Sequence, residues 1–309
     1  MNNKNLIAQY LAQQNPLIID GGLATELENR GVELDTALWS AHLLIENPSL
    51  IRDVHLAYLE AGADVIITAS YQASIPGFRN FSLTTEEATS LIGLSADLAC
   101  LARDVFCVSL SGDKRLRPLV AASVGPYGAS LADGSEYHGD YGISRQELAD
   151  FHWPRIEILA RSNADLLAIE TIPSRMEAQV LCDLLQEFDD VYAWMSFSCK
   201  DERHISDGTL FREIAVIADD NPRIAAVGVN CTNPEYVSGL LDEAGSIETP
   251  LLAYPNSGEA WDVGTREWVG KGSDLSIAHE WVRNGASLVG GCCRVGPQAI
   301  SDLRKLLVK

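Results

Sequence analysis

Short runs of β-branched and apolar residues recur along the whole chain, and polar stretches of helix length separate them. Each run is nearly continuous in hydrophobicity, whereas a strand with one exposed face would alternate between apolar and polar residues. The eight runs are LIID at 17, DVIITAS at 64, LVAASVG at 119, DLLAIET at 165, YAWMSFS at 192, IAAVGVN at 224, PLLAYP at 250 and SLVGG at 287. The pattern predicts eight parallel strands that are covered on both sides.

The stretches between these runs are amphipathic, as expected of the helices that connect parallel strands. They include residues 47–62, 86–106, 144–164 and 274–286. Several begin with Ser, Thr, Asp or Asn and end near Gly, which helix termini prefer. Eight strands alternating with helices favour an α/β fold of the (β/α)8 TIM barrel type over an open Rossmann sheet. No linker or low-complexity segment interrupts the alternation, so we expect a single domain over residues 1–309.

Two connections that follow predicted strands are long and polar, namely residues 125–142 after the third strand and 199–208 after the fifth. In this type of barrel the loops after the strands build the active end, whereas the loops before them mainly serve stability. Ordinary surface loops have a similar composition. Because both loops belong to the same end, we expect them to border an active site.

Charge and hydropathy narrow the class of partner. The 309 residues include 23 Lys and Arg against 43 Asp and Glu, a net charge of −20, which repels phosphate backbones and acidic membrane surfaces. This argues against nucleic acid and membranes as partners. No apolar run approaches the ~20 residues that cross a bilayer, and the N-terminus lacks a signal peptide's apolar core. We therefore expect a cytoplasmic protein with small-molecule substrates.

The seven cysteines are odd in number and widely scattered, which in a reducing compartment favours metal binding or catalysis over disulfides. Cys231 ends the sixth run in VGVNC, and Cys292 and Cys293 end the eighth in VGGCCR. Barrel geometry brings these strand ends to one rim. Adjacent strand residues point to opposite faces, so one metal can bind both Cys292 and Cys293 only if the backbone turns. We expect Gly290 and Gly291 to permit that turn.

Three thiolates with an open fourth position suit Zn²⁺, which is tetrahedral, redox-inert and tolerant of sulfur. A thiol that entered the open position would lose its proton and become a nucleophilic thiolate. Two alternatives remain at this point: the vicinal pair as a redox switch, or all three residues as buried packing groups. The sequence contains no HExxH, GxGxxG or P-loop motif. The remaining cysteines are interpreted as packing residues: Cys100, Cys107, Cys182 and Cys199.

A set of longer motifs adds to this reading. In order they are DGGLATEL (20–27), SVGPYGASLADGSEY (123–137), IETIP (169–173), GVNC (228–231), YPNSGE (254–259) and GGCCR (290–294). With them the chain resembles the homocysteine S-methyltransferase family over nearly its whole length. The resemblance implies that residues 1–309 form a homocysteine-binding barrel in which Cys231, Cys292 and Cys293 hold one Zn²⁺.

Within that family, TASYQAS, SVGPYGASLADGSEY and HISDGT are most similar to the short bacterial and plant-type enzymes that use S-methylmethionine. The resemblance implies methyl transfer from S-methyl-L-methionine, and more weakly from S-adenosylmethionine, to L-homocysteine, giving L-methionine in methionine biosynthesis. Betaine as donor is the closer rival, and a non-enzymatic redox or zinc-sensing barrel is the more distant one. No cobalamin or folate module is expected.

Strand position and the family resemblance together suggest which residues bind the substrate. Asp20 follows the first strand and Glu170 ends the fourth, so both carboxylates are expected at the metal's rim. The resemblance implies that they bind the ammonium group of homocysteine. The backbone amides that follow Gly21 and Gly22 are predicted to bind its carboxylate. Asn230 either orients Cys231 or satisfies local backbone groups. No catalytic side chain beyond the zinc site is predicted.

A sulfonium donor favours aromatic faces. The tyrosines on or near the predicted rim loops are candidates for that contact, although tyrosines in loops also pack against the barrel: Tyr71, Tyr127, Tyr137 and Tyr141. The resemblance alone places YPNSGE next to the substrate.

Overall fold

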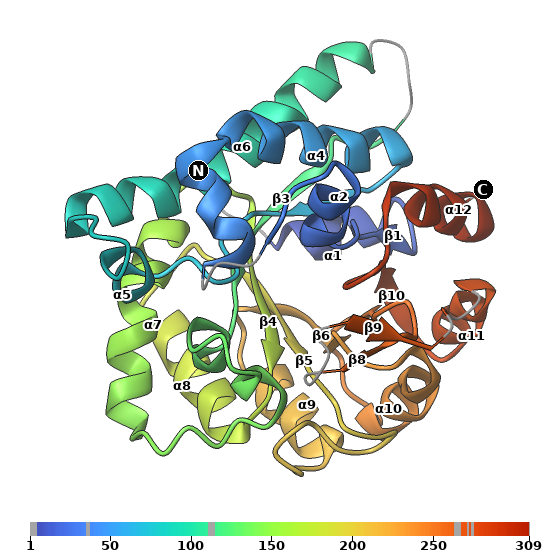
Figure 1. Ribbon diagram of the computed structural model, residues 1–309. Helices are drawn as coiled ribbons and strands as arrows, with labels where there is room; N and C mark the ends of the chain where they lie inside the picture. The colour runs from blue at the N-terminus through green and yellow to red at the C-terminus, as the bar shows by residue number, and fades with distance from the viewer. Residues whose placement is uncertain are drawn as a thin grey trace.

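The computed structural model describes residues 5–34, 38–110, 115–262, 267–270, 272 and 275–308. Over these residues eight parallel strands form one sheet in the order β1-β10-β7-β6-β5-β4-β3-β2. A parallel bridge between Ile19 and Val65 joins the two ends of this order and closes the barrel. Figure 1 shows the larger helices arranged around the strands. The predicted (β/α)8 TIM barrel is confirmed.

Every strand of the barrel overlaps one of the eight apolar runs. The bounds are β1 (Leu17–Ile18), β2 (Val65–Ile67), β3 (Leu119–Val124), β4 (Leu166–Ile172), β5 (Ala193–Phe197), β6 (Ile224–Asn230), β7 (Leu251–Tyr254) and β10 (Ala286–Val289). The continuous hydrophobicity of the runs has the expected cause, because each strand packs on helices outside and on other strands across the interior.

The outer helices are α4 (Pro48–Ala61), α6 (Thr85–Ser109), α7 (Arg145–Ala160), α8 (Arg175–Leu185), α9 (Phe211–Asp219), α10 (Val237–Ala244), α11 (Ala278–Arg283) and α12 (Pro297–Leu307). Shorter helices are α1 (Leu6–Leu11), α2 (Leu23–Asn29), α3 (Leu43–Glu46) and α5 (Ile75–Arg79). Thr84 and Ser144 start α6 and α7 with capping boxes to Glu87 and Glu147.

Two local predictions need correction. The helix expected over 274–286 is shorter, because a 3-10 turn (Leu275–Ile277) precedes α11 and β10 begins at Ala286; residue 274 lies outside the described part of the chain. An antiparallel hairpin of β8 (Ala260–Asp262) and β9 (Glu267–Val269) follows β7 and was not predicted. Strands of three residues offer too few positions for a periodic pattern.

The barrel interior changes from apolar to polar along the strands. Leu119 and Ala121 of β3 belong to the interior cluster, and the next residue with the same orientation is Ser123. By the same alternation Glu170 of β4 and Ser196 of β5 follow apolar inward positions near the carboxyl ends of their strands. The polar end of the barrel is therefore also the end where the loops predicted to border the site begin.

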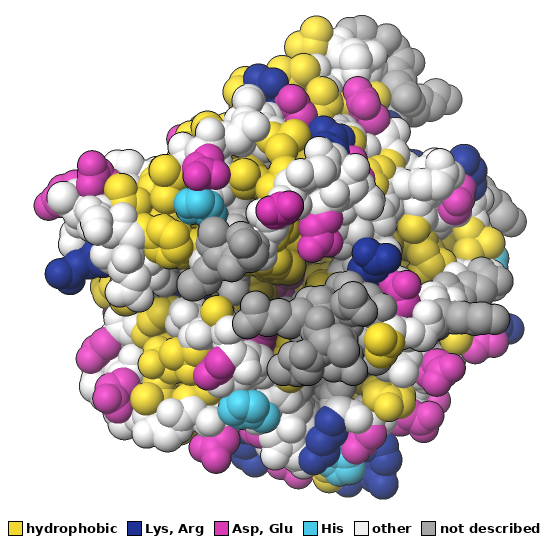
Figure 2. Space-filling view, in the orientation of Figure 1, with side chains coloured by type: hydrophobic (Ala, Val, Ile, Leu, Met, Phe, Trp, Pro, Cys, Tyr) yellow, Lys and Arg dark blue, Asp and Glu magenta, His cyan; other side chains and the backbone are white. Residues whose placement is uncertain are grey.

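Acidic and basic side chains are scattered around the face shown in Figure 2 and do not gather into one patch of a single sign. Among the described helices, none combines the length and the hydrophobicity that crossing a membrane requires.

Candidate metal centre and substrate site

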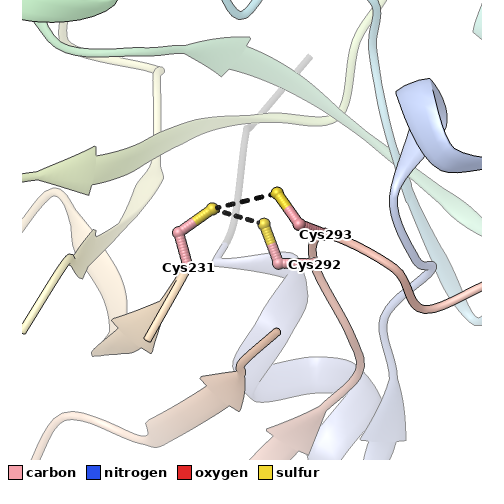
Figure 3. Close-up of side chains that lie close together, drawn as sticks. All are labelled: Cys231, Cys292 and Cys293. Carbon is pink, nitrogen blue, oxygen red and sulfur yellow. Dashed lines mark hydrogen bonds between the residues drawn. The ribbon is translucent and has the colours of Figure 1, made fainter. Parts of the chain in front are cut away.

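The three cysteines converge at the carboxyl end of the barrel. Cys231 directly follows β6, and Cys292 and Cys293 follow β10. The Sγ atom of Cys231 lies 2.6 Å from that of Cys292 and 3.9 Å from that of Cys293. All three sulfur atoms lie within 4.8 Å of one another. Figure 3 shows the thiols of the two segments pointing toward each other, so the structure brings together the residues that the sequence grouped.

The backbone at Cys231 is unusual. Its φ is +46°, a left-handed conformation that residues with a side chain rarely adopt. On a regular continuation of β6, Cys231 would point away from the side of Asn230. The left-handed residue breaks that alternation, and its thiol meets those of the segment after β10. Local strain of this kind persists where the surrounding structure holds it, often at functional sites.

The two glycines before the cysteine pair do not adopt a left-handed conformation. Neither Gly290 nor Gly291 has a positive φ; the left-handed residue is Arg294, with a φ of +67°. The glycines are needed for close approach instead. A Cβ at Gly290 would lie 2.7 Å from the Cβ of Ile19, and one at Gly291 would lie 2.2 Å from the nearest methyl carbon of Val295. The strand does end before these glycines, at Val289, and they permit close packing there and not a left-handed turn.

The segment 254–259 holds this pair through its backbone. The amide of Cys292 donates to the carbonyl of Pro255 at 2.8 Å, and the amide of Cys293 donates to Oδ1 of Asn256 at 3.2 Å. The amide of Ser257 donates to the carbonyl of Cys293 at 3.0 Å. The YPNSGE motif therefore fixes the orientation of two of the three thiols, a role that its turn-like composition did not disclose.

The donor set fits a zinc ion. Sulfur atoms around tetrahedral zinc lie ~3.8 Å apart, given Zn–S distances of about 2.3 Å. The separation of Cys231 and Cys293 already matches this value, and Cys292 needs a shift of about 1 Å away from Cys231. Contacts with Cys292 and Cys293, followed by burial, raise the pKa of Cys231 well above its usual range. A bound cation reverses that effect and favours three thiolates.

Two buried carboxyl groups lie in the same end of the barrel. Asp20 is 3% exposed; its Oδ2 accepts a hydrogen bond from the amide of Ile67 at 2.8 Å, and its Oδ1 has no partner among the described residues. Burial raises the pKa of Asp20 well above its usual value, and the charges of Glu170 and Cys292 raise it further. Burial also raises the pKa of Glu170 to about 8.

Glu170 is held by hydroxyl groups from other strands. Ser123 donates to Oε1, and the hydroxyl of Tyr254 donates to Oε2 at 3.1 Å. The Tyr254 hydroxyl in turn accepts from Nε1 of Trp194 at 3.1 Å and lies 2.5 Å from Oγ of Ser196. Sequence reasoning missed these four supporting residues. The available signal was the polar atoms at inward positions within apolar runs.

The other predicted substrate residues also make contacts within the protein. Asn230 accepts from the amide of Thr171 and donates to its Oγ1, both at 2.7 Å. Thr171 has a φ of +61° and lies where the pairing of β4 with β5 shifts register. Asn230 therefore stabilises an irregularity next to Glu170. The amide of Gly22 donates to the carbonyl of Val295 at 2.9 Å, whereas the next amide, that of Leu23, begins α2.

The four candidate tyrosines divide into two pairs. Burial and then the charge of Cys231 raise the pKa of both Tyr71 and Tyr137. Tyr127 and Tyr141 pack together with ring centroids 5.2 Å apart, and Tyr141 donates to Glu177 at 3.0 Å. Of the four, Tyr71 and Tyr137 are thus the pair whose ionisation the thiols influence.

The predicted packing role holds for most of the remaining cysteines. Cys100 and Cys182 belong to the core between strands and helices, and Cys199 packs against it. Cys107, on α6, is partly exposed.

Fold and site together define a (β/α)8-barrel protein with a candidate cysteine metal centre and buried carboxyl groups at the active end. The family model described as homocysteine S-methyltransferase matches residues 17–307. Homocysteine S-methyltransferase YbgG of Bacillus subtilis (strain 168) is 47% identical over 302 residues, covering 96% of either chain. Homocysteine S-methyltransferase 2 of Arabidopsis thaliana is 46% identical over 325 residues, covering 99% of this chain and 98% of that protein.

A solved structure is similar to this chain in fold and sequence. The metallated form of the homocysteine methyltransferase MmuM from Escherichia coli superposes with a TM-score of 0.88 at 42% identity, covering 98% of this chain and 99% of that one. The chain belongs to the homocysteine S-methyltransferase family and is a methyltransferase.

Proposed function

We propose that the protein is a zinc-dependent enzyme that transfers a methyl group from S-methyl-L-methionine to L-homocysteine, giving L-methionine. S-Adenosylmethionine is a weaker donor in this proposal, and the reaction serves methionine biosynthesis in the cytoplasm. The observation that carries it is the convergence of three thiols from two strands beside two buried carboxyl groups. Membership of the homocysteine S-methyltransferase family supports the acceptor.

Cys231, Cys292 and Cys293 would hold the zinc ion. Among the described residues, the side chains that could bind a metal ion here are these three cysteines. Zinc usually has four ligands, so a substrate sulfur would be the fourth. Bound there, zinc would lower the pKa of an entering thiol, so that the sulfur is a thiolate at neutral pH.

Asp20 and Glu170 would bind the ammonium group of homocysteine. The Oδ1 atom of Asp20 is buried without a partner among the described residues, and an ammonium group supplies the missing donor. A cation beside the two carboxyl groups also lowers their raised pKa values, so that both become ionised as the substrate binds. The amide of Leu23 at the start of α2 would bind the substrate's carboxylate. Fixing both ends of the amino acid limits where its sulfur can lie.

The methyl group then passes directly between two sulfur atoms. A bond forms from the homocysteine sulfur to the methyl carbon while the bond from that carbon to the sulfonium sulfur breaks, and its electron pair stays on the donor, which becomes a neutral thioether. The thiol proton leaves to solvent before this step. The contribution of the chain is alignment of the two sulfurs, an effect worth roughly 7–11 kcal/mol in favourable intramolecular reactions. No side chain has to act as a nucleophile.

The decisive test measures bound zinc and homocysteine methylation in parallel for wild type, Cys231→Ser and Cys292→Ser. We expect about one zinc per chain in wild type, and in both variants a large loss of metal with at least about a 10³-fold loss of activity, because a hydroxyl is a poor substitute for a thiolate ligand. Cys107→Ser, on α6, is the matched control and should keep both. Full activity in metal-stripped wild type would overturn the proposal.

A comparison of methyl donors tests the assignment of S-methylmethionine. With homocysteine fixed, kcat/KM is measured for S-methylmethionine, S-adenosylmethionine and betaine. We expect the values to fall in that order. A higher value for betaine would overturn the assigned donor while leaving the zinc site and the acceptor intact.

A further inference from the structure

Glu136 is a partly buried acid that none of the roles above uses. It lies in the 3-10 helix Ser135–Tyr137, within the loop after β3. Its Oε2 atom is buried and has no hydrogen-bond partner in the described part of the chain. Burial raises the pKa of Glu136, and a hydrogen bond from its own backbone amide offsets part of that rise. An uncompensated carboxylate oxygen in this position is unfavourable unless a ligand supplies a donor.

The backbone around Glu136 is closely packed, so the point from which the carboxylate extends is fixed. Its carbonyl accepts a hydrogen bond from Oγ of Ser198 at 3.2 Å. A Cβ at Gly128 would lie 2.5 Å from the amide nitrogen of Glu136, which shows how tightly the two halves of the loop approach each other. The loop therefore presents the carboxylate from a fixed support.

Hydrogen bonds place the segment of Glu136 beside the segment of Cys231. Ser198, which donates to the carbonyl of Glu136, follows β5, and the next amide, that of Cys199, donates to Oγ1 of Thr232 at 3.0 Å. Thr232 directly follows Cys231, so Glu136 lies at the same rim as the thiols.

Two tyrosines belong to the same surroundings. Burial, and then the charges of Cys231 and Glu136, raise the pKa values of Tyr71 and Tyr137. The charges of Cys292 and Cys293 also raise the pKa of Tyr137, and 42% of the surface of this residue is exposed. A partly exposed tyrosine at this rim is available to a ligand.

This arrangement matches the charges of an amino-acid sulfonium. Such a donor carries one positive charge on sulfur and a second on its α-ammonium group, which a short carbon chain separates. A sulfonium is attracted to aromatic faces, and an ammonium group forms its strongest hydrogen bonds with a carboxylate. Two tyrosines and a carboxylate at the rim that carries the thiols supply both kinds of partner.

We propose that Glu136 binds the α-ammonium group of the methyl donor, with the donor's sulfonium against Tyr71 and Tyr137. This inference rests on the proposed function and adds to it a second amino-acid site, separate from Asp20 and Glu170. Glu136 is then a specificity-determining residue, because it favours donors that carry an ammonium group over sulfonium compounds that lack one.

The test is calorimetric titration of the zinc-loaded protein with donor in the absence of homocysteine, so that binding is measured without turnover. The two probes are S-methylmethionine and dimethylsulfoniopropionate, a sulfonium without an ammonium group. Glu136→Gln should weaken S-methylmethionine binding about 10- to 100-fold, as expected for loss of a charge-assisted hydrogen bond, and leave dimethylsulfoniopropionate binding unchanged. Glu136→Asp, which keeps the charge, should lose less affinity than Glu136→Gln.

Two further variants complete the design. Asp140→Asn removes an exposed charge from the same loop and should bind both probes as wild type does. Tyr137→Leu should weaken both probes, because both carry the sulfonium. Equal affinity of wild type and Glu136→Gln for S-methylmethionine would overturn the inference, and so would equal losses for both probes in Glu136→Gln. A wild type that methylates homocysteine from betaine alone would instead refute the proposed donor, a distinguishable result.

Discussion

Among the described residues two glutamates, Glu170 and Glu177, are buried in this barrel, and their surroundings differ. Glu177 on α8 accepts a hydrogen bond from the amide of Tyr127 at 2.6 Å and one from the hydroxyl of Tyr141 at 3.0 Å. Nε2 of His152 lies 2.8 Å from the same carboxylate. Glu170 on β4 is held by hydroxyl groups alone. Glu177 thus has amide, hydroxyl and imidazole partners. Among the described residues, Glu170 has neither a cationic nor an amide hydrogen-bond donor.

Charge follows the same division. The buried guanidinium of Arg155 donates to the carbonyls of Gly125, Ser70 and Tyr71. Burial lowers the pKa of Arg155, and the charge of Glu177 raises it more than the charge of Glu170 does. Burial of Glu170 raises its pKa to about 8, and Arg155 offsets only a small part of that shift. The comparison indicates that a buried acid with amide and imidazole partners stabilises the fold, whereas one with hydroxyl partners and a raised pKa is prepared for a cationic ligand.

The largest expected effect concerns the stabilising glutamate. Glu177→Ala leaves His152 and two loop donors without their acceptor, so the free energy of unfolding should fall by about 3–5 kcal/mol, measured by urea denaturation. The KM for homocysteine should stay within about twofold, because the acceptor site is elsewhere. Glu213→Ala, which breaks an exposed pair with Arg175, is the control and should change stability by less than about 1 kcal/mol. An equally small change in Glu177→Ala would remove the distinction.

The ligand-binding glutamate should behave in the opposite way. Glu170→Gln should raise the KM for homocysteine about 10- to 100-fold, because the proposed charge-assisted contact with the ammonium group is lost. Its unfolding free energy should change little near neutral pH, since the substrate-free protein holds Glu170 protonated and an amide of the same shape replaces a neutral carboxyl group. Steady-state kinetics with saturating S-methylmethionine measure the first effect. An unchanged KM would show that Glu170 does not contact the acceptor.

Stability should depend on pH through Glu170. Its pKa is about 8 in the folded protein against an ordinary 4.5, so the folded state holds a proton that the unfolded state releases between these values. Stability is therefore highest at the acid end of that window and declines as the pH rises through it, by on the order of a few kcal/mol. Urea unfolding of substrate-free protein at pH 6.5 and 8 should show a smaller decline for Glu170→Gln than for wild type. Parallel curves would contradict the assignment, because the other titrating groups are common to both proteins.

The smallest effect is expected for a supporting hydroxyl. Ser123→Ala removes one donor to Glu170, which should raise the pKa of that carboxyl further and increase the KM for homocysteine about fivefold, in line with about 1 kcal/mol for one hydrogen bond. The pH at which KM begins to fall should also move upward. Ser95→Ala on α6, another buried serine, is the control and should leave KM unaltered. If both variants behave alike, Ser123 does not support Glu170.

Much of the site could be predicted because it follows from strand position. In a barrel of parallel strands every strand ends at the same rim, so Asp20, Glu170, Cys231 and the Cys292–Cys293 pair are near one another as soon as the eight strands are recognised. Partners that act across strands could not be predicted in this way. The contacts of Tyr254 with Glu170 and Ser196 depend on the register between β4, β5, β6 and β7.

The sequence by itself determined the eight strands and which chemistry lies at their ends, because continuous apolar runs report burial on both sides and need no knowledge of neighbours. Tertiary structure alone decided how that chemistry is held. The left-handed backbone at Cys231, the irregularity that Asn230 stabilises at Thr171, and the close approach at Gly290 each arise from contact between segments distant in the chain. Local periodicity carries no information on such contacts, since register and packing are settled only when the strands meet.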